Sequence, residues 1–269
     1  MHIDFHILSK KMQRYYISTS YNGTNYCGWQ IQPNGISVQE TVSKCLSTIL
    51  GEETLITGAG RTDAGVHAKY MPAHFDTTQP IDDCARLVNR LNSFLPKDIA
   101  IQGLCPVHAD AHARFDATAR SYEYHVVTRK SPFHEGLACR LPHPVDFNAM
   151  NLAAKRLFQY TDFTSFSKLH TDVKTNDCTI MRAEWEQISE DHWVFHIRAN
   201  RFLRNMVRAV VGTLLRVGRS EIDAEGFCRI IEAKDRCQAG QSVPACGLYL
   251  TEVDYPYPLD YITDKPTRR

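Results

Sequence analysis

The order of hydrophobic patterns along this chain limits the folds that it can adopt. Apolar residues alternate with a period of two over residues 14–21, then recur at helical spacing over 38–49, with Ser37 placed as an N-cap and Gly51 as the terminating residue. Further strands are expected over 54–57, 71–75 and 99–107, and a second helix over 81–94. This β-α-β-β-α-β order is typical of the split βαβ, ferredoxin-like arrangement, in which two helices cover one face of an antiparallel sheet.

The second half of the chain repeats this order without visible sequence identity. Strands are expected over 122–128, 180–188, 193–198 and 247–253, and helices over 148–160 and 204–217. We therefore predict an α+β fold of two ferredoxin-like (split βαβ) modules whose antiparallel sheets join into one extended sheet, with helices on one side and a cleft between the modules. The predicted divisions are a leader over residues 1–12, an N-terminal module over 13–109 and a C-terminal module over 110–269, with a mobile loop over 161–176.

The composition is that of an ordinary globular protein, with 43% hydrophobic residues, 23% charged residues and a formal net charge of +1. No apolar run approaches the roughly 20 residues that a membrane helix needs. The first eleven residues include Asp4, where a secretory signal would have a basic start and an apolar stretch. We expect a cytoplasmic protein with no membrane segment, and any nucleic-acid site on it has to be local because the net charge is low.

The nine cysteines are odd in number and include no Cys-x-x-Cys pair, which disfavours both a disulfide framework and a zinc site. Cys45 and Cys228 lie in amphipathic helical patterns, where a reduced thiol behaves as a small hydrophobe. His108 and His112 are four residues apart and could share a helix face, but the residues between them lack the glutamate of a zinc-protease motif. We therefore expect no metal site.

A basic block lies in the second half of the chain, over residues 198–219, and contains no acidic residue. Its arginines are Arg198, Arg201, Arg204, Arg208, Arg216 and Arg219. Arginine makes bidentate phosphate contacts that lysine cannot make, whereas a solvated helix face is the alternative interpretation. We predict that Arg201 and Arg204 contact the phosphates of a nucleic acid.

Arg208 differs from the rest of the block because its helical turn is otherwise apolar. Its charged group therefore either reaches out to solvent or is paired inside the protein. A buried arginine without a partner is several kcal/mol unfavourable, and the expected helix contains no acid. Asp63 is the candidate partner, and Gly212 nearby would let another backbone segment approach.

Residues 58–68 are the stretch with the clearest chemistry. Three glycines in eight positions permit positive φ angles and close approach of a ligand to the backbone, and Arg61 stands two residues before Asp63. A flanking arginine favours an ionised carboxylate, which can then act as a nucleophile or a base. A hairpin turn with a surface ion pair is the alternative.

The run of residues 59–68 resembles the signature loop of the TruA family of tRNA pseudouridine synthases, in which the aspartate of Gly-Arg-Thr-Asp is catalytic. Four further groups of residues extend the resemblance over nearly the whole chain after Met12, namely 21–30 with 38–39, 112–115 with 119–124, 202–208 with Gly212, and 247–250. The resemblance implies isomerisation of uridine to pseudouridine at positions 38, 39 and 40 in the anticodon stem-loop of tRNA. It further implies a homodimer whose two subunits grip one tRNA, and a reaction that needs no cofactor and no metal.

The same resemblance implies roles for individual residues around a catalytic cleft. Asp63 would be the nucleophile and Arg208 its partner. Arg61 would help to turn the target nucleotide out of its stack, Tyr122 would stack on the uracil, and Leu248 would pack against the base. Residue types alone favour Tyr122 as a sheet residue that packs across a strand and Leu248 as a core residue, because both types are ordinary in strands.

Two other functions fit part of the sequence. A nucleoside or glycoside hydrolase would normally use a second carboxylate at its site, and none stands near Asp63 in the loop. A non-catalytic RNA-binding module on a ferredoxin-like sheet would carry a Gly-Phe-aromatic run of the RNP1 type, which is absent from this sequence. Three routes stay open for the carboxylate, which could attack C1′, add to C6 or abstract the 2′ proton.

Overall fold

The computed structural model describes residues 12–168 and 175–263, so residues 1–11 of the predicted leader and the middle of the predicted mobile loop lie outside the described part of the chain. The described residues form an α+β structure with five α-helices and one nine-stranded sheet. The strand order is β4-β1-β3-β9-β5-β8-β7, with β2 paired to β3 and β6 paired to β5. Within the described residues, no helix is long and apolar enough to cross a membrane.

The elements of the first half follow the predicted order. They are β1 (Gln13–Tyr21), α1 (Val38–Leu50), β2 (Thr57–Gly58), β3 (His67–Thr77), α2 (Cys84–Phe94) and β4 (Ile99–Val107). Helix α1 has the predicted caps, because the Ser37 hydroxyl accepts a hydrogen bond from the Glu40 amide at 3.1 Å and Gly51 ends the helix with a φ of 73°. The strand predicted over 54–57 is paired only from Thr57, because the Ile56 amide donates to the Ser43 hydroxyl of α1 and not to a neighbouring strand.

The second half contains the predicted elements and some that the pattern did not predict. They are β5 (Ala119–Val127), β6 (Cys139–Arg140), α3 (Phe147–Ala154), β7 (Ile180–Ser189), β8 (His192–Ala199), α4 (Met206–Gly218), α5 (Ala224–Glu232) and β9 (Leu248–Asp254). The helix predicted over 148–160 is α-helical only to Ala154 and continues as a 3-10 helix, Lys155–Gln159. Helix α4 begins two residues later than predicted, after Asn205 with a φ of 66°. Helix α5 contains Cys228 and agrees with the amphipathic helical pattern noted around that residue, for which the sequence analysis gave no bounds.

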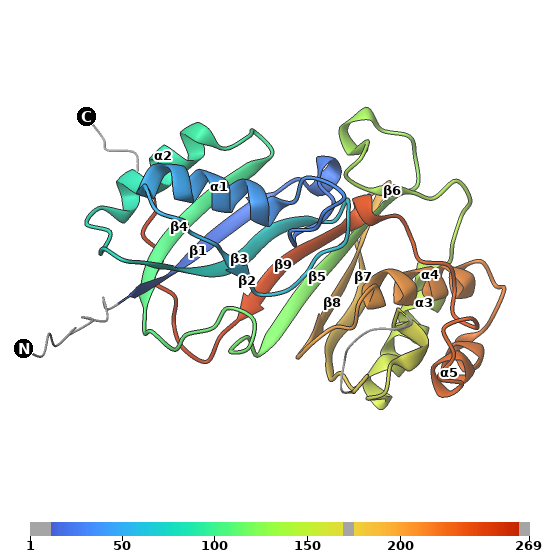
Figure 1. Ribbon diagram of the computed structural model, residues 1–269. Coiled ribbons are helices and arrows are strands. Elements are labelled where there is room, and N and C mark those ends of the chain that lie inside the picture. The colour runs from blue at the N-terminus through green and yellow to red at the C-terminus, as the bar shows by residue number, and fades with distance from the viewer. Residues whose placement is uncertain (1–11, 169–174, 264–269) are drawn as a thin grey trace, which may run out of the picture.

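The two halves of the sheet meet where β3 pairs in parallel with β9, at His67 with Tyr249 and Ala68 with Leu250. Figure 1 shows α1 and α2 over one end of the sheet and α3, α4 and α5 near the other end. Leu248 and Leu250 are two residues apart in one strand and therefore point to the same face. Since Leu248 belongs to the core of the second half and Leu250 to that of the first, the helices of both halves cover the same face of the sheet.

The loop between β2 and β3 passes from one core to the other. Ala59 is buried in the core of the first half, and Val66 is buried in the core of the second half. The residues between them, including Asp63, therefore lie where the two helix layers meet.

The segment after β4 excludes the shared helix face that the spacing of His108 and His112 would have allowed. Residues 108–116 are not helical, so His108 and His112 do not share a helix face. The Asp116 carboxylate accepts a hydrogen bond from the His112 amide at 2.7 Å, which closes a turn in place of a helix. Among the described residues, no group of three or more His, Cys, Asp or Glu side chains is placed to hold a metal ion.

Candidate active site

The Asp63 loop is held against the segment that follows β1. The Trp29 amide donates to the Thr62 carbonyl at 3.2 Å, and the hydroxyls of Thr62 and Tyr21 are 2.9 Å apart. Gly28 has a φ of 95°, and a Cβ at this position would stand 2.4 Å from the Thr62 carbonyl oxygen. Only glycine fits this close backbone approach, so the residue next to Asp63 is fixed by contacts from both its carbonyl and its side chain.

Two arginines from the second half approach the Asp63 carboxylate. Arg208 Nη1 lies 3.6 Å from Oδ2, and Arg204 Nε lies 3.6 Å from Oδ1. Both distances are within the range of an ion pair but are longer than a hydrogen bond. Within residues 12–168 and 175–263, no protein group donates a hydrogen bond to this carboxylate. Two positive charges therefore lie beside the carboxylate, while its oxygens stay available to react.

Arg208 is the predicted partner of Asp63, whereas the flanking Arg61 does not pair with it. Arg61 is exposed, and in the described part of the chain its side chain makes no ion pair or hydrogen bond. The cations beside Asp63 come from the other half of the molecule because this carboxylate faces the start of α4. Arg61 therefore lies next to the site with its guanidinium free to meet a ligand.

The position of Arg208 is fixed by the segment 240–243, which runs along α4. Arg208 Nε donates to the Val243 carbonyl at 2.7 Å, and the Val243 amide donates to the Arg208 carbonyl at 3.2 Å. This segment approaches so closely at Gly212 that a Cβ there would stand 1.9 Å from the Gln241 carbonyl oxygen. The predicted close backbone approach at Gly212 is therefore present, and it brings the acceptor that orients Arg208.

Tyr122 and Leu248 lie on the face of the sheet that the helices cover. They are diagonal neighbours across the β5–β9 pair, and the Tyr122 ring meets the Phe202 ring edge-on at 5.1 Å between centroids. Burial raises the pKa of Tyr122 to about 12, and the negative charge of Asp63 contributes to this rise. The phenol is therefore neutral at physiological pH and lies near the carboxylate, whereas Leu248 is only 6% exposed.

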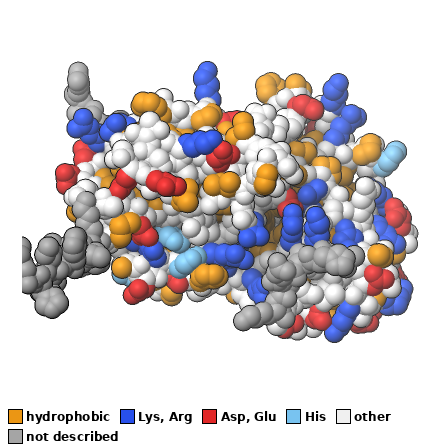
Figure 2. Space-filling view, in the orientation of Figure 1, with side chains coloured by type: hydrophobic (Ala, Val, Ile, Leu, Met, Phe, Trp, Pro, Cys, Tyr) orange, Lys and Arg blue, Asp and Glu red, His pale blue; other side chains and the backbone are white. Residues whose placement is uncertain are grey.

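The basic block is divided by the fold into paired and unpaired arginines. Arg198 forms ion pairs with Asp254 and Glu252, and Arg216 and Arg219 both form ion pairs with Glu221. Arg201 is half-buried, and among the described residues its side chain has no ion-pair partner. Figure 2 shows Lys and Arg side chains gathered near the middle of one face of the molecule. The predicted block is thus not one continuous free basic face.

Arg120 is a half-buried residue of the site whose role the sequence did not indicate. Its Nη1 donates to the carbonyls of Ala117 and Asn200 at 3.0 and 3.1 Å, and its Nη2 donates to those of Ala59 and Arg114 at 3.1 and 2.9 Å. Burial lowers its pKa. One guanidinium therefore binds the start of the Asp63 loop to two other segments of the chain, one after β4 and one after β8.

His67 is a second residue whose role the sequence did not indicate. Its Nδ1 accepts a hydrogen bond from the Gly23 amide at 3.0 Å, and its Nε2 is 3.1 Å from the Cys246 carbonyl, so the ring is a neutral tautomer that donates from Nε2. Burial lowers its pKa, in agreement with a neutral ring. The ring also stacks on Tyr249 at 4.5 Å, and so it binds the end of the Asp63 loop to the strand that carries Leu248.

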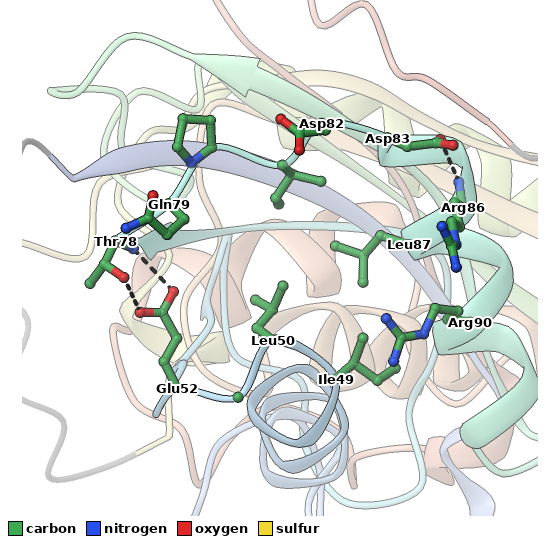
Figure 3. A pocket seen from close by; sticks show the side chains of 13 residues that line it. Ile49, Leu50, Glu52, Thr78, Gln79, Asp82, Asp83, Arg86, Leu87 and Arg90 are labelled. Atoms are coloured by element: carbon green, nitrogen blue, oxygen red, sulfur yellow. Dashed lines mark hydrogen bonds between the residues drawn. The ribbon is translucent and has the colours of Figure 1, made fainter.

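A separate pocket of about 490 Å³ lies between the end of α1, the segment 78–83 and α2 (Figure 3). Its wall includes Ile49, Leu50 and Leu87, and Arg86 and Arg90 stand at the side formed by α2. None of the residues predicted for the site lines this pocket. We assign it no part in the chemistry of Asp63.

The fold and the site together define a class of protein. A carboxylate that accepts no hydrogen bond from the described residues lies between two arginines and beside a neutral tyrosine, at the junction of the two sheet halves. This arrangement is suited to covalent or base chemistry on an anionic substrate. Comparison with known proteins identifies the family within this class. The sequence model of the family described as tRNA pseudouridine synthase matches residues 17–116 and 153–256.

Named relatives match over most of their own length. A tRNA pseudouridine synthase A of Parabacteroides distasonis is 57% identical over 253 residues, which cover 94% of this chain and 100% of the relative. The proteins of the same name from Bacteroides fragilis and Colwellia psychrerythraea are 56% and 40% identical, covering 91% and 90% of this chain and 97% and 94% of the relatives. The chain belongs to the tRNA pseudouridine synthase family, and Tyr122 and Arg120 fall between the two matched segments.

Proposed function

We propose that this protein isomerises uridine to pseudouridine in tRNA, at positions 38, 39 and 40 of the anticodon stem-loop. The observation that carries the proposal is the Asp63 carboxylate with Arg208 and Arg204 each 3.6 Å from one of its oxygens. Family membership and the names of the relatives support the activity and the tRNA substrate.

The reaction breaks the bond between N1 and C1′, turns the uracil within the site, and joins C5 to C1′ while the proton on C5 is released. Asp63 is the proposed nucleophile, and attack at C1′, addition at C6 and removal of the 2′ proton are its three possible first steps. Arg208 supplies a positive charge that is in place before the substrate arrives, and such preorganised charge is usually the largest single contribution to catalysis. The half-buried position of Asp63, with 29% of its side chain exposed, limits competing reaction with water.

The remaining proposed roles concern binding of the flipped nucleotide. Base flipping costs a few kcal/mol in lost stacking, and Arg61 is free to occupy the space that the nucleotide leaves. Tyr122 would stack on the uracil, a contact worth roughly 1 to 3 kcal/mol, and Leu248 would complete the surface against the base. Arg201 and Arg204 would contact phosphates, which position an RNA without reading its sequence.

We also propose the finer architecture. The first half, residues 13–109, has strand order β4-β1-β3-β2, and the second half, residues 110–269, has strand order β9-β5-β8-β7. When the two-residue strand β6 is left out and the strands are numbered within each half, both orders are 4-1-3-2. This common order supports two ferredoxin-like modules with the catalytic cleft between them.

A cytoplasmic homodimer completes the proposal, because one copy offers limited area for a folded tRNA. Light scattering over a dilution series tests the subunit number. An active monomer at micromolar concentration would remove the two-subunit grip from the proposed function and leave the chemistry of Asp63 unaffected.

The decisive experiment uses tRNA with tritium at C5 of uracil. Isomerisation releases tritium to solvent without free uracil, a hydrolase liberates uracil, and a binding module does neither. tRNAs in which uridine 38, 39 or 40 is replaced singly by cytidine locate the modified positions. Release that is unaffected by all three replacements would contradict the anticodon stem-loop as the target.

A further inference from the structure

The turn formed by residues 112–116 holds an aromatic ring in solvent. Phe115 is 75% exposed although exposure of apolar surface to water is unfavourable. The turn around it is tightly bonded, because the Asp116 amide donates to the His112 carbonyl at 3.0 Å and the Asp116 carboxylate accepts from the Tyr257 hydroxyl at 2.6 Å. The exposed position of the ring is therefore set by the folded structure.

The neighbours of the Phe115 ring hold it in an arrangement suited to stacking. The ring packs on His112 with centroids 4.2 Å apart, and the Arg114 guanidinium lies 5.8 Å from its centroid. Burial lowers the pKa of His112, whose ring in turn meets His74 at 4.6 Å. An aromatic ring supported from behind and accompanied by a cation is the arrangement that proteins use to bind unpaired bases and their phosphates.

This turn stands beside the Asp63 loop. Arg120 Nη2 donates both to the Arg114 carbonyl and to the Ala59 carbonyl, so one nitrogen binds the turn and the loop. The guanidiniums of Arg114 and Arg201 are also close enough to Arg120 to act on its pKa in the lowering direction. Positive charge is therefore concentrated where the turn meets the site. Figure 2 shows one face of the molecule on which His and hydrophobic side chains lie next to Lys and Arg side chains.

We propose that Phe115 and Arg114 form a stacking site for an unpaired nucleotide of the RNA that neighbours the modified uridine. The inference rests on the proposed function. A flipped uridine no longer stacks on its neighbour, and the Phe115 ring replaces that lost contact while Arg114 binds the adjoining phosphate. Arg120 is the positioning residue that keeps this site at a fixed place relative to Asp63.

The test uses variants that separate the effects of the aromatic ring, of the side-chain volume and of the position in the structure. Phe115→Leu keeps apolar volume without the ring, Phe115→Trp keeps a ring, and Phe133→Leu is the matched control because Phe133 is 85% exposed in a different part of the structure. We expect Phe115→Leu to weaken binding of an anticodon stem-loop RNA by about 5- to 150-fold, the ratio that corresponds to one lost base stack. Phe115→Trp and Phe133→Leu should bind like the wild type.

A spectroscopic readout identifies stacking directly. Stem-loop RNAs that carry one 2-aminopurine at successive loop positions lose emission where that base becomes stacked, and we expect quenching at a neighbour of the target with the wild type but not with Phe115→Leu. Arg114→Gln supplies an independent variant should Phe115→Leu not fold, and it should flatten the slope of log affinity against log salt by about 0.7.

Two results would overturn the stacking site. The first is that Phe115→Leu and Phe133→Leu show equal RNA affinity and equal quenching. Where Arg114→Gln is used instead, the corresponding result is an unchanged slope of log affinity against log salt. The other is weakened subunit association in light scattering with unchanged RNA affinity, which would make Phe115 a contact between two copies. If the proposed function is wrong, the result is different. The wild type then releases no tritium, but RNA affinity and 2-aminopurine emission still show whether a base stacks on Phe115.

Discussion

The two halves of the molecule have the same order of strands and major helices but supply different parts of the site. The first half provides a carboxylate from a loop, Asp63, whose position depends on backbone contacts to the segment after β1. The second half provides cations near the start of α4 and the side chains Tyr122 and Leu248 from adjacent strands. Neither half contains the carboxylate together with its charged partners, so the site exists only when both halves are assembled.

The junction between the halves is short compared with the pairing inside each half. Strand β1 pairs with β3 from Gln13 to Tyr21, whereas β3 and β9 are in register at only two positions. Side chains reinforce this junction, because Arg120 and His67 each hydrogen-bond to backbone groups across it. The relative position of the two halves, and hence of Asp63 and Arg208, therefore depends on a few buried polar side chains.

The largest loss of activity is expected when the carboxylate that the first half contributes is removed. Asp63→Asn keeps the shape of the side chain but removes the nucleophile, so tritium release should fall below about one per cent of wild type, because an amide does not replace a covalent catalyst. RNA binding should persist, since phosphate contacts supply most of the affinity. Glu53→Gln, at an exposed acid of the same half, is the control and should leave activity unchanged.

Two results would contradict this view of Asp63. Activity close to wild type would make it a turn residue, a position that asparagine serves equally well. Loss of folding would make the Asp63–Arg208 pair structural, because rupture of a buried pair costs about 3 to 5 kcal/mol. Circular dichroism and a thermal melt separate this second result from loss of chemistry.

The next largest effect on kcat is expected at Arg208, and it distinguishes Arg208 from Arg204, the two cations of the second half that lie beside Asp63. Arg208→Ala removes a guanidinium that is only 21% exposed and is oriented by the Val243 carbonyl. We expect kcat to fall by about 10² to 10³, the usual loss when one preorganised charged or hydrogen-bonding group is removed. Arg204→Ala removes a guanidinium that is 60% exposed, and we expect less than about a fivefold change in kcat because exposed ion pairs contribute about 1 kcal/mol or less. Equal losses in single-turnover assays would show that the site does not distinguish the two.

The features predicted from the sequence are mainly those determined locally. The caps of α1 at Ser37 and Gly51 depend on residues within one turn of the helix, and both were found. The Asp63–Arg208 pair was predicted because a charge in an apolar helical turn needs a partner from elsewhere. Arg120 and His67 gave no such signal, because their acceptors are carbonyls as many as 80 and 179 residues away in the chain. Any residue type can supply a backbone carbonyl, so sequence alone does not reveal these contacts.

Two glycines give a smaller effect, which tests how each half positions its part of the site. Gly212→Ala would place a Cβ 1.9 Å from the Gln241 carbonyl oxygen, whereas Gly60→Ala would meet no atom within 4 Å. We expect Gly212→Ala to lower the free energy of unfolding by about 1 to 3 kcal/mol, as overpacking does, and to reduce kcat because Val243 moves with its segment. Gly60→Ala should stay within about 0.5 kcal/mol of wild type. Urea unfolding measures both, and equal stabilities would refute the close contact at Gly212.

The smallest effect concerns how much of the RNA affinity the second half supplies. Arg201→Gln and Arg204→Gln should each flatten the slope of log affinity against log salt by about 0.7 to 0.9, because each lost phosphate contact releases one fewer counterion. Arg198→Gln is the matched control, since Arg198 already forms ion pairs with Glu252 and Asp254. If the slopes of the Arg201 and Arg204 variants equal that of wild type, the basic block is only a solvated surface. If Arg198→Gln flattens the slope as much as they do, the RNA displaces the ion pairs of Arg198, and pairing with Glu252 and Asp254 does not keep Arg198 from the RNA.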